Sequence, residues 1–138
     1  MTDELADLEH ALDLALKADF AAVPGAGKEE DLLAMSRIHN KVDVLDHRVL
    51  MPFDTAQQHR AQGHTSPVGW LEHNTHAHAD DAARRRRLSR RLRRHPIAEE
   101  AMAEGEITAR HVDVLDKARR AVGDTAYRIA EQVLVDTA

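Results

Sequence analysis

The sequence predicts an all-α protein, a multi-helix bundle with an N-terminal antiparallel helical hairpin and a helix-turn-helix-like core. Apolar residues recur at steps of three and four along most of the chain, which is the spacing of a helix face. No stretch shows the alternation of apolar and polar residues that indicates a strand. Aromatic residues make up only 3% of the chain, so the core must consist of Leu, Val, Ile and Ala, which suits packed helices. The 138 residues have the length of a single domain.

A helical hairpin and a connector are expected over residues 1–62. The first helix covers residues 3–22 and carries four leucines spaced by three and four residues: Leu5, Leu8, Leu12 and Leu16. Pro24 and Gly25 end this helix. A second helix follows over residues 28–50, and two helices joined by a short loop most simply pack antiparallel.

The second helix carries a narrow apolar seam over residues 35–49. Its members are spaced 3-4-3-4, as in a coiled coil: Met35, Ile38, Val42, Leu45 and Val49. The seam suits either the inner side of the hairpin or a homodimer, and the spacing does not decide between them. Pro52 is expected to end or kink the helix, and residues 53–62 to form a short helix closed by Gly63 in a left-handed conformation.

The core is expected over residues 63–122. Ser66 followed by Pro67 predicts a helix start, because a serine oxygen accepts a free backbone N–H and proline fits the first turn. In the resulting short helix, which ends near His73, Trp70 and the adjacent leucine form the buried side. Thr75 is then the expected N-cap of a long basic helix over residues 76–94.

That basic helix holds most of the positive charge of the chain. Residues 84–95 contain eight of the 19 basic residues and none of the 24 acidic ones. At 100° per residue, one side carries His78, Ala82, Arg85, Leu88, Ser89 and Leu92, and Asp81 is placed to pair with Arg85. The other seven arginines are expected to point outward: Arg84, Arg86, Arg87, Arg90, Arg91, Arg93 and Arg94.

Two further helix boundaries follow. Pro96 breaks the basic helix, because the residue before a proline is pushed out of helical geometry. A helix over residues 97–104 ends at Gly105, and Thr108 caps a helix over residues 109–122. The C-terminal segment, residues 123–138, forms a last helix whose expected inner residues are Ala126, Ile129, Val133 and Leu134.

The region from Glu30 to about Arg120 resembles the 13E12 repeat family, an actinobacterial domain of unknown function numbered 222. The resemblance is carried by Gly63-His64-Thr65-Ser66, Trp70-Leu71, Ala82-Ala83-Arg84, Leu92, Pro96, Ala101, Gly105-Glu106-Ile107-Thr108 and His111. In that family the helical domain commonly precedes an HNH endonuclease domain, so the resemblance implies work on DNA. We expect no nuclease domain here, because the sequence ends at Ala138, and a nuclease partner would be a separate protein.

The same stretch is more weakly similar to the helix-turn-helix core of ParB-type partition proteins. In those proteins a recognition helix leads into a Leu-Pro junction and then a Gly-x-x-Ser/Thr-x-x-His turn. The corresponding segments here are residues 75–94, His95-Pro96 and residues 105–111. Two features depart from the pattern: the turn around residues 73–75 lacks the usual glycine, and Arg94-His95 stands where an apolar residue is expected before the proline.

The row of arginines predicts contact with nucleic-acid phosphates, because guanidinium groups bind phosphate oxygens through paired hydrogen bonds. Neutralisation by the acidic N-terminal hairpin and simple solvation are the competing interpretations. We therefore expect a non-catalytic, DNA-associated module of low sequence specificity. The alternative is a protein-interaction domain, or a truncated remnant whose nuclease is absent or supplied in trans.

Several other classes of function lack support in the sequence. The chain has no cysteine, which rules out disulfides and thiol nucleophiles and is compatible with a cytoplasmic location. No apolar run reaches the roughly 20 residues of a membrane span. Two histidine groups, His39–Asp43–His47 and His73–His76–His78, cannot surround an ion from one helix flank or turn. We thus expect no catalytic residues, no metal and no cofactor.

Overall fold

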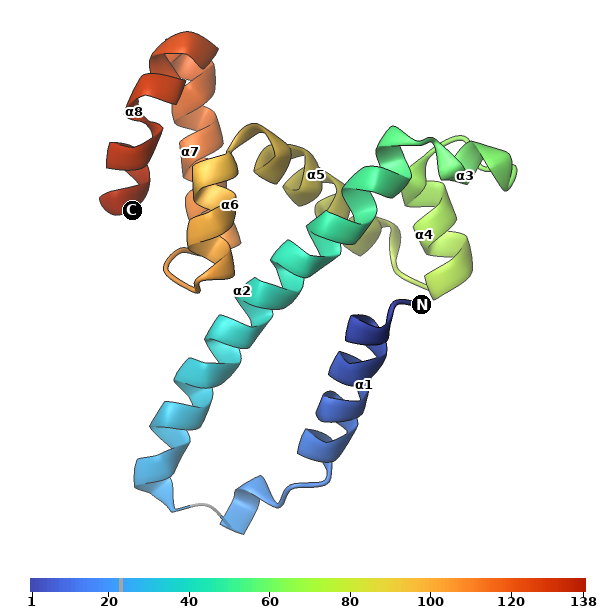
Figure 1. The fold of residues 1–138 in the computed structure, drawn as a ribbon, viewed down its shortest axis with the longest axis vertical. Helices are drawn as coiled ribbons and strands as arrows, with labels where there is room; N and C mark the ends of the chain where they lie inside the picture. Colours follow the sequence, from blue (N-terminus) through green and yellow to red (C-terminus); the bar gives the residue numbers. More distant parts are fainter. Residues whose placement is uncertain (23) are drawn as a thin grey trace. The chain divides into compact units, whose positions relative to one another are not determined.

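The computed structural model describes residues 1–22 and 24–138, without the side chain of Ala26. The described residues form helices and no strand, which confirms the all-α prediction (Figure 1). The elements in order are α1 (Asp3–Leu16), the short 3-10 helix η1 (Phe20–Ala22), α2 (Gly25–Thr55), α3 (Gln58–Ala61), α4 (Pro67–Thr75), α5 (Ala79–Arg94), α6 (Pro96–Ala103), α7 (Ala109–Val122) and α8 (Asp124–Asp136).

The chain divides into two compact units, Met1–Ala34 and Met35–Ala138. In the first unit, α1 begins at an N-cap, Thr2, whose hydroxyl accepts the N–H of Leu5 at 3.4 Å. The helix ends at Leu16, six residues before the predicted end, and none of its residues is buried. The leucine stripe therefore has no core beneath it in this unit.

The sequence left open whether Pro52 ends helix α2 or only kinks it. The helix continues past Pro52 to Thr55, so the first alternative is wrong. A proline inside a helix costs one backbone hydrogen bond. Side chains of the last turn hold it in place within the second unit: the rings of Phe53 and Trp70 lie 4.8 Å apart, and Asp54 contacts Arg86. Packing beyond the proline thus offsets the lost bond.

The seam on α2 is largely open to solvent. Met35, Ile38, Val42 and Val49 are all exposed hydrophobic residues, whereas Val44, between two seam positions, is 2% exposed and belongs to the core. The buried side of α2 in the second unit is therefore not the seam.

The start of α4 agrees with the prediction. Ser66 Oγ accepts the N–H of Gly69 at 3.1 Å, Pro67 stands in the first turn, and Gly63 has a φ of +82°. Leu71 is buried, and Trp70 is half-buried with its indole N–H donating to Gln62 at 2.8 Å. Helix α4 runs two residues further than predicted.

Thr75 is not the N-cap of the basic helix. It is the last residue of α4, and its hydroxyl donates to the carbonyl of Leu71 at 2.6 Å. The cap of α5 is His78, whose Nδ1 accepts the N–H of Asp80 at 3.2 Å. His76 follows Thr75 and takes a φ of +56° between the two helices, a conformation that glycine adopts more readily than other residues.

The main core lies among α5, α6, α7 and α8, with Val44 added from α2. Its central residues are Leu92, Met102, Val112 and Tyr127, each no more than 1% exposed. A smaller cluster joins Leu50, Leu71 and Ala82. Of the six residues predicted on the inner side of α5, four are buried: Ala82, Leu88, Ser89 and Leu92. Arg85 is half-buried, and the side chain of His78 is 75% exposed.

The boundaries around α6 are confirmed. Pro96 is the first residue of α6, and Gly105, with a φ of +80°, donates its N–H to the carbonyl of Met102 at 3.0 Å. Thr108 is the N-cap of α7, and its N–H donates to Nδ1 of His111 at 3.0 Å.

The predicted face of α8 is wrong for three of its four residues, because only Leu134 packs against the core. Ile129 and Val133 are 82% and 65% exposed, whereas Tyr127, Glu131 and Val135 are buried. Glu131 has polar partners on the buried face: one of its carboxylate oxygens accepts the N–H of Ile97 at 3.2 Å and also reaches the N–H of Ala98 at the start of α6. Hydrophobic spacing alone carries no trace of this capping role.

Candidate nucleic-acid interface

Helix α5 places eight arginines on 16 residues, and its buried side fixes how they project. Because the side with Leu88 and Leu92 faces the core, the arginines leave the helix along its flanks and its outer face. Five are exposed, and three, Arg85, Arg86 and Arg91, are half-buried. The expectation that all seven outer arginines point into solvent is therefore wrong for Arg86 and Arg91.

Arg85 pairs with α2 rather than with Asp81 on its own helix. Its Nε donates to Oδ2 of Asp46 at 2.9 Å, and a terminal nitrogen reaches the other carboxylate oxygen. This two-point contact raises the pKa of Arg85, chiefly through the hydrogen bond with Asp46. On the same flank, buried Ser89 lies 2.9 Å from Nδ1 of His47, whose pKa is lowered by burial. The pair anchors α5 to α2.

Three more arginines face carboxylates of α2 at longer range. Arg84 lies 3.8 Å from Asp43, and Arg86 and Arg90 lie 3.5 and 3.8 Å from Asp54. The side chains of Arg84 and Arg90 are 52% and 56% exposed, so water screens both pairs. Acidic residues of the predicted hairpin region thus neutralise part of α5, as one of the competing interpretations held.

Arg91 faces α7. It donates to Asp113 and lies 3.7 Å from Asp116, which is 2% exposed. Asp116 also accepts from Nε2 of His95 at 3.0 Å and from Nε of Arg119 at 3.2 Å. Burial alone would raise the pKa of Asp116, but the hydrogen bonds from His95 and Arg119 bring it below its usual value. This buried aspartate ties α5, α7 and the α5–α6 junction together.

The remaining arginines of α5, Arg87, Arg93 and Arg94, are exposed and have no carboxylate at ion-pair distance within residues 1–22 and 24–138. Arg87, Arg90 and Arg94 are spaced by three and four residues and therefore share one face. The seven predicted site residues are thus divided: four have acidic partners, and three do not.

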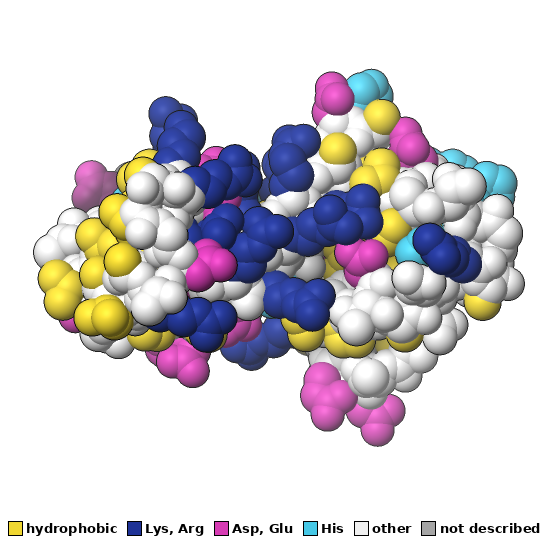
Figure 2. Space-filling view, turned by 90° about the horizontal axis from the view of Figure 1, so that it is seen from above, with side chains coloured by type: hydrophobic (Ala, Val, Ile, Leu, Met, Phe, Trp, Pro, Cys, Tyr) yellow, Lys and Arg dark blue, Asp and Glu magenta, His cyan; other side chains and the backbone are white. Residues whose placement is uncertain are grey.

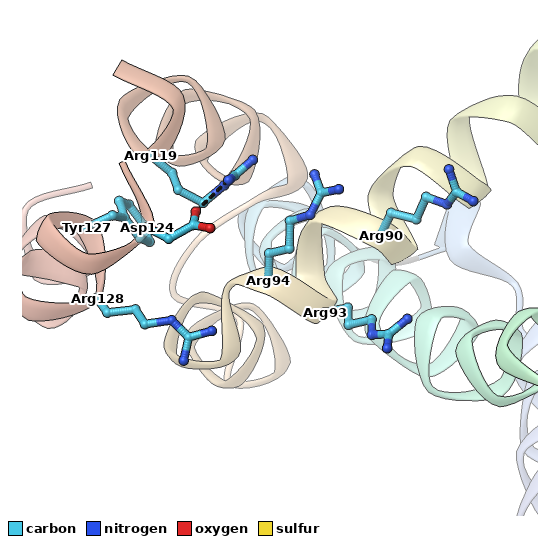
Figure 3. A pocket seen from close by; sticks show the side chains of 7 residues that line it. All are labelled: Arg90, Arg93, Arg94, Arg119, Asp124, Tyr127 and Arg128. Carbon is cyan, nitrogen blue, oxygen red and sulfur yellow. Dashed lines mark hydrogen bonds and ion pairs between the residues drawn. The ribbon is translucent and has the colours of Figure 1, made fainter. Parts of the chain in front are cut away.

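A groove of about 560 Å³ adjoins the end of α5 (Figure 3). Five arginines from three helices, one aspartate and one tyrosine line it: Arg90, Arg93, Arg94, Arg119, Asp124, Tyr127 and Arg128. In Figure 3 the α5 arginines lie along one side of the groove, and Arg119 and Asp124 are joined on the other. We call this the cationic groove.

Arg119 and Arg128 are functional candidates that the sequence did not reveal. Each lies in a helix with mixed charge, 25 or more residues after the end of α5, so no local pattern marks them. They reach the groove because α7 and α8 pack together and α7 also packs on α5. Arg128 is exposed and, in the described part of the chain, has no ion-paired carboxylate.

Seen from above, arginine and lysine side chains gather in a band between the α7–α8 pair and the α3–α4 pair (Figure 2). A few carboxylates interrupt the band. The arginines of the cationic groove come from α5, α7 and α8, so the groove is basic although the whole chain has a formal charge of −5.

The histidine groups do not assemble a metal site. His47 is buried against Ser89, and Asp43 faces Arg84, so two members of the first group are engaged elsewhere. In the second region, the rings of His64 and His73 lie 5.3 Å apart without a third ligand. Across the residues that the structure describes, no three His, Cys, Asp or Glu side chains are grouped to hold an ion.

Comparisons of the chain with protein-family models, with curated proteins and with solved structures give no match. Among the described residues, no helix is both long and apolar enough to span a membrane.

Proposed function

We propose that this chain binds DNA without catalysis and with low sequence specificity, by contacting the phosphate backbone with the exposed arginines of α5 and with the cationic groove. The observation that carries the proposal is the convergence of five arginines from three helices on one groove that contains a single carboxylate. The resemblance to the 13E12 repeat family points to the same class of ligand.

The physical reason is charge density. Guanidinium groups repel one another when they are crowded on one surface, and a polyanion relieves that repulsion. Arginine also matches phosphate geometry, because its N–H groups donate in pairs to two oxygens. Neither the groove nor the α5 face presents a pattern of different donors and acceptors, so we expect no strong preference for sequence.

The ion pairs within the protein indicate which arginines are available to contact DNA. Arg85 and Arg91 are committed to Asp46 and Asp113 and serve to hold α5 in place. Arg84 and Arg90 have distant, solvent-screened partners and can turn to a phosphate at little cost. We therefore propose contacts from five arginines of α5, together with Arg119 and Arg128; the five are Arg84, Arg87, Arg90, Arg93 and Arg94.

The test is the salt dependence of binding to a duplex of random sequence, measured by fluorescence anisotropy. Proposed contacts that give up a carboxylate when they bind phosphate release no net counterion. The four arginines without ion-paired carboxylates, Arg87, Arg93, Arg94 and Arg128, therefore predict that log K falls with log salt at a slope of about −3.6. Changing any one of them to Ala should reduce that slope by about 0.9.

Exposed arginines elsewhere provide the control. Arg60 and Arg110 do not line the groove, so their alanine variants should bind like the wild type. Equal losses from the control variants would mean that net charge alone drives binding. Absence of salt-sensitive binding would contradict the proposal and favour the alternative, a protein-interaction domain whose partner has an acidic surface.

A further inference from the structure

The cationic groove already contains one anion of its own. Asp124 is the first residue of α8, and its carboxylate accepts a hydrogen bond from a terminal nitrogen of Arg119 at 2.7 Å. The side chain of Asp124 is 72% exposed, so the pair lies at the solvent-facing side of the groove.

The surroundings of Asp124 are those of an anion-binding position. The hydrogen bond from Arg119 lowers the pKa of Asp124, and the nearby charges of Arg128 and Arg94 lower it further. These three arginines come from α7, α8 and α5, so positive charge reaches the carboxylate from three helices. A carboxylate and a phosphate group accept the same guanidinium donors.

Arg119 has a second contact, which does not involve Asp124. Nε of Arg119 donates to Asp116 at 3.2 Å, and Asp116 is only 2% exposed. The guanidinium is therefore held from behind by a buried carboxylate while a terminal nitrogen faces the groove. If Asp124 is displaced, this terminal nitrogen of Arg119 can donate to another anion in the groove.

We propose that the cationic groove contains a phosphate-binding site, here called the phosphate seat, which the carboxylate of Asp124 occupies. A phosphate group must then displace this carboxylate from Arg119 in order to bind. The inference rests on the proposed DNA binding and adds a competing internal anion to it. Asp124 thus lowers the affinity of the groove, and a variant that lacks its charge binds phosphate more tightly than the wild type does.

The experiment compares Asp124→Asn with the wild type in the duplex titration. In the wild type, the phosphate that binds Arg119 leaves Asp124 as an unpaired carboxylate, which offsets about one released counterion. The variant lacks that carboxylate, so at about 100 mM salt it should bind about eightfold more tightly. Its slope of log K against log salt should also be steeper by about 0.9. Circular dichroism of both proteins verifies that the helices are unchanged.

Asp80→Asn is the matched control, because it removes the same charge from a side chain that is 96% exposed at the other end of α5. Asp80 and Arg94 are about 21 Å apart along the helix, about two Debye lengths at that salt concentration. Less than a twofold change in this variant shows that the gain at Asp124 is local.

The outcomes separate the two proposals. A wild type that binds the duplex, with Asp124→Asn binding equally or less tightly, overturns the phosphate seat and leaves DNA binding intact. Absence of duplex binding by both proteins overturns both proposals. A gain of similar size in Asp80→Asn also overturns the phosphate seat, because it assigns the effect to net charge.

A competition arm identifies the source of the phosphate. Sodium tripolyphosphate is added to the preformed duplex complex, with sodium chloride of equal ionic strength as the reference. Stronger displacement by tripolyphosphate shows that the seat takes free phosphate chains as well as nucleic acid. Equal displacement shows that it takes nucleic-acid phosphates alone, and the gain in Asp124→Asn is required in both cases.

Discussion

A histidine takes the place of an apolar residue at the junction between α5 and α6. His95 is fully buried, its Nε2 lies 3.0 Å from Asp116, and its ring meets that of Tyr127 edge to face with centroids 4.9 Å apart. A buried polar ring is tolerated when it has a hydrogen-bond partner. The departure from the Leu-Pro pattern is therefore compensated by one aspartate on α7.

Tyr127 provides a prediction at this scale. Burial, followed by the charges of Glu131 and Asp116, raises the pKa of Tyr127 to about 12. Its hydroxyl is buried and has no hydrogen-bond partner among the residues that the structure describes, so Tyr127→Phe should leave the free energy of unfolding unchanged or raise it by about 1 kcal/mol at pH 7.

The pH dependence checks the same variant. A raised pKa in the folded state gives stability that is complete below pH 10, the usual pKa of tyrosine, and is lost as the pH rises toward 12. Urea unfolding at several alkaline pH values should show a steeper loss for the wild type than for Tyr127→Phe. A large destabilisation of the variant at neutral pH would mean that the hydroxyl has a bonding role.

At the scale of single elements, helix ends were predictable and helix faces were less so. Ser66, Gly105 and Thr108 act as boundaries through bonds within a few residues, so their local sequence contains the signal. Thr75 failed as a cap because the turn is made by His76 in a left-handed conformation, which few side chains adopt.

The candidate nucleic-acid interface, like the helices, could be predicted only in part from the sequence. Composition alone located the arginine helix, and periodicity identified its buried side. The acidic partners of Arg85 and Arg86, which are Asp46 and Asp54, are distant from them in sequence. The two groove arginines outside α5, Arg119 and Arg128, are distant from it in sequence as well. Such contacts depend on how helices pack, and no local pattern encodes them.

Gly105 supports a prediction about an element boundary. Its φ is +80°, and an added Cβ would lie 3.1 Å from Cγ of Arg37, so Gly105→Ala should destabilise the protein by about 1–2 kcal/mol. Gly69→Ala is the control, because Gly69 lies inside α4, where an added Cβ meets only ordinary contacts and alanine favours the helix. Urea denaturation measures both, and an unchanged Gly105→Ala variant would contradict the account of this turn.

The apolar seam on α2 supports a second prediction. Val42 and Val49 are 43% and 52% exposed, as self-association through residues 35–49 requires, and the homodimer stays a prediction. If it forms, Val42→Asp should shift the chain from dimer to monomer in light scattering. Val114→Asp, an equally drastic change on the exposed side of α7, should not. A monomeric wild type would contradict the prediction.

For the molecule as a whole, the distribution of buried residues predicts unequal local stability. Helix α1 has no buried residue, whereas α5, α6, α7 and α8 share the main core. Local opening costs least where few apolar contacts are lost. Amide hydrogen exchange should therefore be fast throughout α1 and slow in α5 and α7, and protection of α1 equal to that of α7 would contradict this.

The cations of the groove are all arginines, with no lysine or histidine among them. Guanidinium groups keep their proton over the whole range of conditions found in cells. Acidification or mild alkalinity therefore leaves the number of positive charges on this surface unchanged. On the proposed function, we expect a ligand to be released by competing ions or by a competing carboxylate, and not by a change in proton concentration.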